Sequence, residues 1–437
     1  FSLYAQRDSG SAELSRILVQ FPVTSIESDR DSGIIPDSGS VSFFLKLYNA
    51  EHTRTLPRDY KLTVNAINGS WQEGQGLDME NYSDITFDKI GSNWIRRTGA
   101  TGWSSEGGDI YTDTSSSFEQ TFEVGIEDLE IDITELVEQW LDSDSNVLGT
   151  KDNNGVLIKL SASFEASSST NLNGAAKSYY TKKFFARSSE FFFDRPKIEA
   201  RWDSSTRDNR GNFIFSSSAL PPNENLNSLF LYNYFRGNLV DVGGKTTEIP
   251  VLNLYYSSAS VPEGSARYFR DSDNNEINFL SSSRVSKGVY KVTFSATSSV
   301  VTSTYPYLID VWNISGSELH TGSAFLPGAH TFTDFNPHRK YVISMPKLKS
   351  IYTNEGTERF RIYVRDKNWS PNIFTRATSE LDTVLIQSCS YQIKRLIDNR
   401  VVIPYGTSST NHTILSYDVS GNYFDMDMSM LEHGYTY

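Results

Sequence analysis

The sequence contains a single cysteine, Cys389, in 437 residues. One thiol cannot form a disulfide within the chain, and it excludes a metal cluster built from several cysteines. The absence of disulfides fits assembly in a reducing cytoplasm better than secretion as a small cross-linked module.

Long apolar runs and excess positive charge are also missing. No apolar stretch approaches 18 residues and the mean hydropathy is -0.42, so we expect no membrane-spanning segment. Lys and Arg number 40 against 53 Asp and Glu, which gives a net charge of -13. Because binding to phosphate backbones depends on Lys and Arg, we expect no direct nucleic-acid partner.

Motifs for catalysis and metal binding are absent as well. There is no G-x-S-x-G elbow and no phosphate-binding glycine loop, and the six histidines are scattered without metal-ligand spacing. The acidic segments "DSDSN" (142–146) and "DSDNNE" (271–276) lack the Gly and Glu that a calcium EF-hand requires. We therefore expect no enzymatic activity, no cofactor and no metal, although a structural Ca²⁺ held by dispersed loop oxygens in the first domain remains an alternative.

What the chain does contain is typical of β-structure. Segments rich in Val, Ile, Tyr and Phe alternate between apolar and polar residues, and turn residues recur every eight to twelve positions. This pattern predicts an all-β protein made of sandwiches. The segments that we expect to form strands include 15–26, 40–50, 59–67, 152–164, 182–203, 229–240, 251–258, 288–296, 307–314, 341–348, 359–369, 384–397, 412–419 and 422–432.

One segment, "DITELVEQWL" (132–141), has the periodicity of a helix instead. Its apolar residues recur at i, i+3, i+4, i+7 and i+8, and Asp132 is placed to cap the first turn. We expect one short helix here that closes an open end of the first sandwich. Leu136 and Trp140 would be its structural residues, with Trp140 as the main plug.

Two polar, proline-containing segments indicate domain boundaries. The first is 203–228 and the second is 325–340. They predict three domains, at 1–205, 206–330 and 331–437. We expect the third domain to continue beyond Tyr437, because the segment there resembles the start of another strand.

A loop with acidic residues and tryptophans is the main candidate binding site. "WQEGQGLDMENYSD" (71–84) is followed by further tryptophans at "NW" (93–94) and "GW" (102–103). Tryptophans of this kind can pack a loop on a sandwich, or their rings can stack on sugars, and two carboxylates at a suitable separation can form a glycosidase site. The candidate residues are Trp71, Glu73, Asp78, Trp94 and Trp103.

The segment "SYYTKKFFARSSEFFF" (178–193) carries seven aromatic residues. A continuous strand here would place aromatic side chains on both faces, either in a core or against another subunit. The candidate contact residues are Tyr179, Tyr180, Phe184, Phe185, Phe191 and Phe193. The C-terminal strand 422–432 is a second candidate contact surface.

The first domain resembles the DNRLRE family, a jelly-roll module related to carbohydrate-binding modules. The resemblance depends on the order "SRILVQFPVTSI", "LKLYNA", W-x-E-G at 71–74, "NW" at 93–94, "DITELVEQWL", "NNGVLIKL" and "FFARSSEFFFDRPKIEARW". It covers about 200 residues and implies an N-terminal jelly-roll sandwich. Because such folds serve many roles, it implies little about function.

The whole chain resembles large structural proteins of tailed phages of marine bacteria and cyanobacteria, in which Ig-like domains follow a jelly roll. The resembling stretches include "RGNFIFSSSALPPNENLNSLFLYNY", "RFRIYVRDKNWSPNIFT", "VVIPYG" and "LSYDVSGNYFDMDMSMLE". This resemblance implies a jelly roll followed by two smaller Ig-like sandwiches. It also implies a non-enzymatic virion component, associated with capsid, neck or tail and assembled in the bacterial host cytoplasm. Its expected partners are other virion proteins and copies of itself. The alternative function is attachment of the particle to a host surface polysaccharide.

Overall fold

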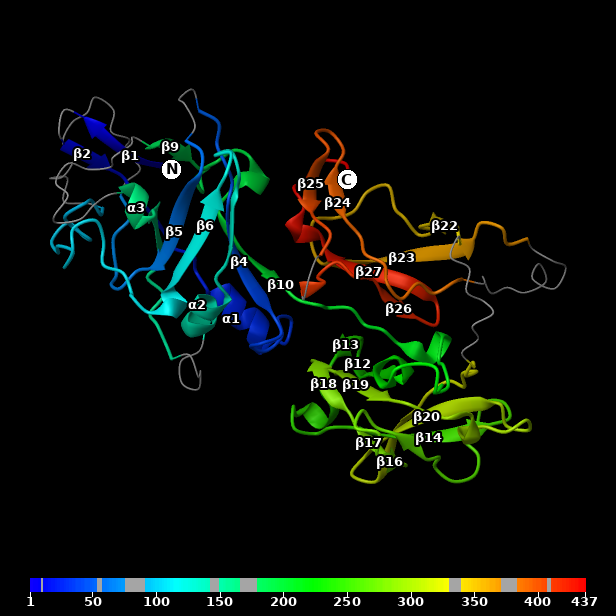
Figure 1. Ribbon diagram of the computed structural model, residues 1–437. Helices are drawn as coiled ribbons and strands as arrows, with labels where there is room; N and C mark the ends of the chain where they lie inside the picture. Colours follow the sequence, from blue (N-terminus) through cyan, green and yellow to red (C-terminus); the bar gives the residue numbers. More distant parts are fainter. Residues whose placement is uncertain are drawn as a thin grey trace. The chain divides into compact units, whose positions relative to one another are not determined.

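The computed structural model describes residues 1–8, 11–52, 57–74, 91–141, 149–165, 179–329, 339–370, 383–406 and 410–437. Strands predominate among their regular elements, which confirms the predicted all-β class (Figure 1). The chain divides into two compact units, Phe1–Trp202 and Asp203–Tyr437. The division lies close to the boundary predicted after residue 205.

The described residues of the first unit form three antiparallel sheets. The smallest sheet contains, in order, β2 (Ser11–Leu14), β1 (Ser2–Asp8) and β9 (Tyr179–Lys183). The second contains β10 (Lys197–Arg201), β4 (Ser42–Leu47) and β7 (Leu129–Asp132). The third contains β3 (Ile17–Val19), β8 (Val156–Leu160), β5 (Tyr60–Ala66) and β6 (Ser117–Phe122).

The two larger sheets share one apolar core, so the unit is sandwich-like. In β4 the side chains of Phe43, Leu45 and Leu47 are fully buried, while the residues between them are half-buried. This is the period of two that the sequence shows, because successive side chains of a strand point to opposite faces. The core continues through the buried side chains of β5 and β8.

The first unit contains three α-helices among its described residues, so the prediction of a single helix was wrong. They are α1 (Thr24–Asp31), α2 (Thr134–Leu141) and α3 (Ala162–Glu165). Helix α1 has no buried residue and hence no apolar stripe for a periodicity argument to find. It is tied to α2 by a two-pronged ion pair in which both Arg30–Glu138 N–O distances are 2.7 Å.

Helix α2 forms where the sequence predicts a helix, and its apolar stripe is buried. Leu136 is fully buried and Trp140 is 8% exposed, and both belong to the core of the first unit. The carboxylate of Asp132 accepts hydrogen bonds from the backbone N–H and hydroxyl of Thr134. Ile133 is joined to the strand partner Phe43 by a backbone hydrogen bond of 2.9 Å, which fixes the start of the helix against β4.

The second unit contains the remaining strands, all in antiparallel sheets. In chain order they are β11 (Asn227–Tyr232), β12 (Tyr234–Phe235), β13 (Asn238–Leu239), β14 (Val251–Ser257), β15 (Phe269–Arg270), β16 (Glu276–Ile277), β17 (Leu280–Ser281), β18 (Ser283–Ser286), β19 (Val289–Phe294), β20 (Tyr307–Ile314), β21 (Ser317–Thr321), β22 (Tyr341–Ser344), β23 (Thr357–Asp366), β24 (Ile393–Arg395), β25 (Arg400–Ile403), β26 (Ser416–Asp418) and β27 (Gly421–Asp427). Among the described residues of both units, the short 3-10 helices are η3 (Thr114–Ser116), η4 (Phe192–Asp194), η5 (Asn209–Gly211), η6 (Pro222–Asn225), η7 (Val242–Gly244), η8 (Ser298–Val300) and η11 (Met428–Met430).

A second apolar core lies between two sheets in the earlier half of this unit. The sheets have the orders β11-β19-β18 and β17-β14-β20-β21. Trp312 of β20, Tyr290 of β19 and Phe294 of β19 are fully buried there. Its members come from residues 213–325. The core therefore falls within the predicted second domain.

The later half of the unit is built on the sheet β22-β23-β27-β26. Strand β27 pairs with β23 along residues 422–427 on one side and with β26 at residues 421–423 on the other, so its first residues lie between two strands. The predicted strand 384–397 is absent over most of its length. Its backbone at Ile386 is hydrogen-bonded instead by the side-chain amide of Asn422, which takes the place of a neighbouring strand.

Residues 203–212 join the two halves of the second unit. Thr206 and Asp208 exchange backbone hydrogen bonds with Tyr417 of β26. Arg210 reaches the other half, where its guanidinium binds the carboxylate of fully buried Asp310 at 2.6 and 3.2 Å. The segment that the sequence identifies as a connection is thus a structural part of this unit, and the division at residue 330 stays a prediction.

Candidate functional site

The structure brings the predicted tryptophan residues into one assembly of loops. Residues 69–74 lie against residues 91–103, because the backbone N–H of Gln72 donates to the carbonyl of Arg97 at 2.9 Å. Trp71, Trp94 and Trp103 all belong to these loops. Asp78 lies outside the described residues.

Each of the three indoles is engaged within the protein. The Nε1–H of Trp71 donates to the carbonyl of Asn154 at 2.8 Å, and that of Trp103 donates to the carbonyl of Asn93 at 2.9 Å. The ring of Trp94 is covered by the guanidinium of Arg16, 4.7 Å from the ring centroid. These contacts favour the interpretation that the tryptophans hold the loops on the sandwich.

Arg16 is the residue that anchors this loop assembly. Besides covering Trp94, it donates to the carbonyl of Gly107 and forms a two-pronged ion pair with buried Glu165 of α3. The sequence signal for this role is weak, because 149 residues separate the two ion-pair partners. Glu73, in contrast, is exposed and lies 3.2 Å from the exposed guanidinium of Arg187.

The aromatic segment 178–193 is not one continuous strand. Strand β9 ends at Lys183, and a turn and the 3-10 helix η4 follow it. Phe184 and Phe193 are buried within the first unit and therefore contribute to its core. Phe191 is 52% exposed and meets the half-buried ring of Phe185 edge-on. The side chains of Tyr179 and Tyr180 lie outside the described residues.

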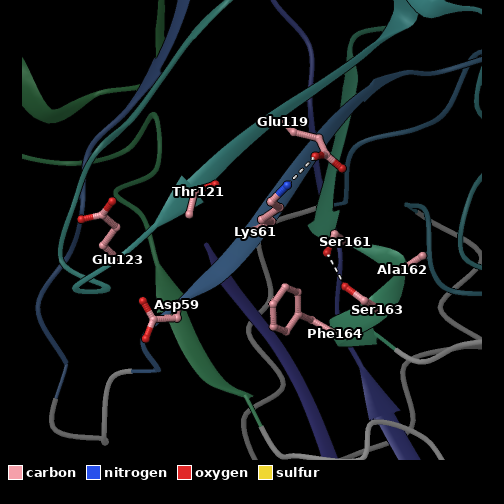
Figure 2. A pocket seen from close by; sticks show the side chains of 9 residues that line it. All are labelled: Asp59, Lys61, Glu119, Thr121, Glu123, Ser161, Ala162, Ser163 and Phe164. Atoms are coloured by element: carbon pink, nitrogen blue, oxygen red, sulfur yellow. Dashed lines mark hydrogen bonds and ion pairs between the residues drawn. The ribbon is translucent and has the colours of Figure 1, made fainter.

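An open groove of about 620 Å³ lies on the first unit, between β5, β6 and α3 (Figure 2). Lys61 and Glu119 point toward one another from neighbouring strands and form an ion pair of 3.3 Å. The carboxylates of Asp59 and Glu123 line the same groove, and Phe164 lies on its α3 side. Sequence reasoning missed this groove because its residues are dispersed over three elements and share no motif.

A second hollow, of about 690 Å³, lies beside α1 and α2. Lys151 lines it, with Nζ 2.8 Å from the carboxylate of Asp113 and 5.3 Å from the centroid of the Tyr111 ring. The hydrogen bond from Lys151 holds the pKa of Asp113 well below its ordinary range. Trp140, the predicted structural residue of α2, also lines this hollow.

Exposed apolar side chains concentrate in residues 339–437. Almost half of the exposed large apolar side chains among the described residues lie in this last part of the chain. Ile351 is 83% exposed and Ile397 is 76% exposed. The members are Tyr341, Ile343, Leu348, Ile351, Trp369, Leu396, Ile397, Val401, Tyr405, Val419, Met430 and Tyr435. We call this set the C-terminal apolar surface.

The described residues contain no group of three or more His, Cys, Asp or Glu side chains placed to hold a metal ion. The acidic segment 142–146, which lacks the pattern of an EF-hand, lies outside the described residues. In the part of the chain that the structure covers, no helix combines the length and the apolar character that crossing a membrane requires.

No known protein-family profile matches the chain, and no curated protein is significantly similar to it in sequence. The resemblances to the DNRLRE family and to phage structural proteins therefore stay predictions.

Proposed function

We propose that the protein is a non-enzymatic structural component of a tailed-phage particle and assembles through surfaces of its β-domains. The jelly-roll part of the proposal is supported by strand order. Strands β3, β5, β6 and β8 lie in one sheet and β4, β7 and β10 in the other, so the chain crosses repeatedly between the two sheets. A jelly roll has crossings of this kind.

The observation that carries the proposal is the C-terminal apolar surface. The twelve residues of this set are defined by their place in one part of the chain, and apolar side chains that gather on a protein surface mark contacts with partners. Ile343 lies on β22, which is an edge strand of its sheet. The side chain of Ile343 is 65% exposed. Such an edge offers unpaired backbone groups to another chain. Its partners would be other virion proteins or further copies of the chain, in the host cytoplasm during assembly.

The test is to locate the protein and to measure its association. We expect mass spectrometry to find it in purified particles at a copy number set by the particle's symmetry. In solution, we expect Ile351→Ser combined with Ile397→Ser to weaken its association in light-scattering measurements. The matched control is Val261→Ser, which changes a 65% exposed side chain outside the surface. Absence from the particles, together with a monomeric wild-type protein, would contradict the proposal.

The second candidate function is binding of a host polysaccharide. The observation that favours it is the open groove of Figure 2, where carboxylates lie beside an aromatic ring. Carboxylates accept hydrogen bonds from sugar hydroxyls, and an apolar ring can pack on a sugar face. We expect binding on a glycan array to fall on the double substitution of Asp59→Asn and Glu123→Gln. If binding is lost on replacing the three tryptophans and not on replacing the two carboxylates, the sugar binds at the loops that contain Trp71.

A further inference from the structure

A fully buried lysine lies at one end of the first unit. Lys182 of β9 is 1% exposed, whereas its neighbour Lys183 is exposed. The ammonium nitrogen lies 4.9 Å from the ring centroid of Phe122 and 5.1 Å from that of Phe184. Burying a charged amine in such surroundings is costly unless it is compensated by specific partners.

Three oxygen atoms surround the Lys182 amine. It donates to the side-chain carbonyl of Asn49 at 2.8 Å, to the carbonyl of Gly125 at 3.1 Å and to the carbonyl of Glu127. The contact with Asn49 brings the amine beside a side-chain amide carbon that is 133 residues away in the sequence. Water has little access to this contact, because the lysine is buried.

The Asn49 amide is held in place by its backbone. Asn49 pairs with Phe184 in an isolated β-bridge, directly next to the end of β9. Its backbone N–H donates to the carboxylate of Asp128 at 2.7 Å. The flanking residue Ala50 donates to the carbonyl of Lys183 at 2.8 Å, so this side of the site is rigidly paired. Proximity and orientation of this kind turn a slow reaction between two groups into an effectively unimolecular step.

Burial of the Lys182 amine increases the fraction that is uncharged at neutral pH, relative to an exposed lysine. Burial lowers the pKa of Lys182 to about 8, although the charges of Asp128 and Glu127 oppose this shift. A neutral amine carries the lone pair that a nucleophile needs, and a desolvated lysine is activated in this way.

We propose that Lys182 and Asn49 condense to form an isopeptide bond within the chain. The Nζ atom of Lys182 attacks Cγ of Asn49, the Nζ–Cγ bond forms, the Cγ–Nδ2 bond breaks and ammonia leaves. Of the two protons on the neutral amine, one passes to the departing Nδ2 and the other stays on the new amide. Asp128 is the carboxylate that we assign to the proton transfer, because it accepts a hydrogen bond from the backbone N–H of Asn49 itself. No oxidant or co-reactant is required.

The bond would replace a buried cation by a neutral amide, whose remaining N–H can donate to one of the two backbone carbonyls. It would also join the segment after β4 to β9, and so close a covalent loop through most of the first unit. A cross-link that closes a long loop stabilises the folded chain by restricting the unfolded one. The cross-link would stabilise the first unit independently of the proposed function of the protein.

The test is the mass of the full-length protein. We expect an intact mass that is lower than the sequence mass by about 17 Da, the mass of one ammonia. Trypsin should release a branched peptide that joins residues 47–54 to residues 178–183, because a modified Lys182 is not cleaved. A folded protein with the full sequence mass and with both peptides unlinked overturns the proposal.

Matched variants identify the atoms that react. We expect Lys182→Arg and Asn49→Ala to restore the full sequence mass, and Lys183→Ala to keep the deficit. Asn49→Asp offers water as the leaving group, so its deficit relative to its own sequence should be about 18 Da. We expect Asp128→Asn to slow the appearance of the branched peptide in freshly refolded protein. A deficit that persists in Lys182→Arg would show that ammonia is lost elsewhere, and would overturn the proposal.

Discussion

At the scale of single residues, Trp140 illustrates how one side chain contributes to the first unit. It is 8% exposed and packs in the core, at the end of an eight-residue helix whose polar residues Glu138 and Gln139 are also buried. Buried polar groups need partners, and Glu138 has one in Arg30 of α1. Trp140 therefore lies where an apolar core and a polar contact between helices meet.

We expect Trp140→Ala to lower the free energy of unfolding by about 3–5 kcal/mol, because removal of a large buried aromatic ring leaves a cavity. Urea unfolding followed by circular dichroism measures this loss. Ile95→Ala is the control, since this side chain is 55% exposed and should lose little. A Trp140→Ala protein as stable as the control would mean that α2 is not a core element.

At the scale of elements, the start of β8 depends on a glycine. Gly155 has a φ of 79°, and a Cβ atom there would collide with the carbonyl oxygen of Val19 and with Gln20. Its own carbonyl accepts a hydrogen bond from Ile67, so the backbone at this position is fixed from two sides. The close approach of the β3 end to β8 thus requires a residue without a side chain.

We expect Gly155→Ala to destabilise the protein more than Gly149→Ala, by at least about 1 kcal/mol. Gly149 has the same φ of 79° but open space around its Cα, so the comparison separates the collision from backbone strain. The comparison uses the midpoints of urea unfolding of the two variants, where we expect the lower midpoint for Gly155→Ala. Equal losses would mean that the strands can move apart at no cost.

A network of charges on the outer side of β4, β7 and β10 predicts a dependence on pH. Lys46 and Arg201 each form ion pairs with Glu130 and Glu199, at distances between 2.6 and 3.4 Å. Burial raises the pKa of Glu199, but the charge of Lys46 and the hydrogen bond from Arg201 outweigh it, so the pKa lies below its ordinary value of 4.5. The same balance lowers the pKa of Glu130.

A lowered carboxyl pKa means that the unfolded chain takes up protons first as the pH falls. The stabilisation by these carboxylates is therefore complete above about pH 5 and is lost as the pH decreases through their lowered pKa values. We expect Glu199→Gln to reduce stability at pH 7 and to flatten its decline below pH 4.5. Unfolding curves from pH 7 to pH 3, with the exposed Glu106→Gln as control, test this. If the wild-type protein and Glu199→Gln lose stability equally as the pH falls, the network does not contribute to acid unfolding.

At the scale of the whole molecule, the two units differ in how their cores are organised. The core of the first unit, its helices and all its strand pairs lie within residues 1–202. The second unit depends on residues 203–212, which bind β26 through the backbone and the buried carboxylate of Asp310 through Arg210. A buried carboxylate that loses its partner is strongly destabilising.

We expect the fragment 1–202 to fold alone and to unfold cooperatively. We expect 203–437 to be more stable than 213–437, by about 3–5 kcal/mol, because the shorter fragment leaves Asp310 buried without Arg210. Thermal and urea unfolding of the three fragments provide the comparison. The single substitution Arg210→Ala in 203–437 should reproduce much of the loss. Equal stability of the two longer fragments would show that the connecting segment is dispensable.

The sequence by itself determined the features that depend on local pattern. Alternation in segments such as 42–47 predicted the all-β class, and the helical spacing of 132–141 predicted the burial of Leu136 and Trp140. Polar residues after Trp202 predicted the first boundary. The all-β class and the helix at 132–141 could be predicted because side-chain periodicity follows directly from the geometry of a strand or helix, whereas the three-domain division stays a prediction.

Only the tertiary structure decided which groups meet. Helix α1 has no apolar stripe and is held by a contact with Glu138 across 108 residues. The two phenylalanines Phe184 and Phe191 look alike in the sequence, yet one is buried and the other is 52% exposed. Lys182 and Lys183 are adjacent, but only Lys182 faces Asn49 in an apolar enclosure. The environment of a charged or aromatic group is set by residues far away in the chain, and no local pattern encodes it.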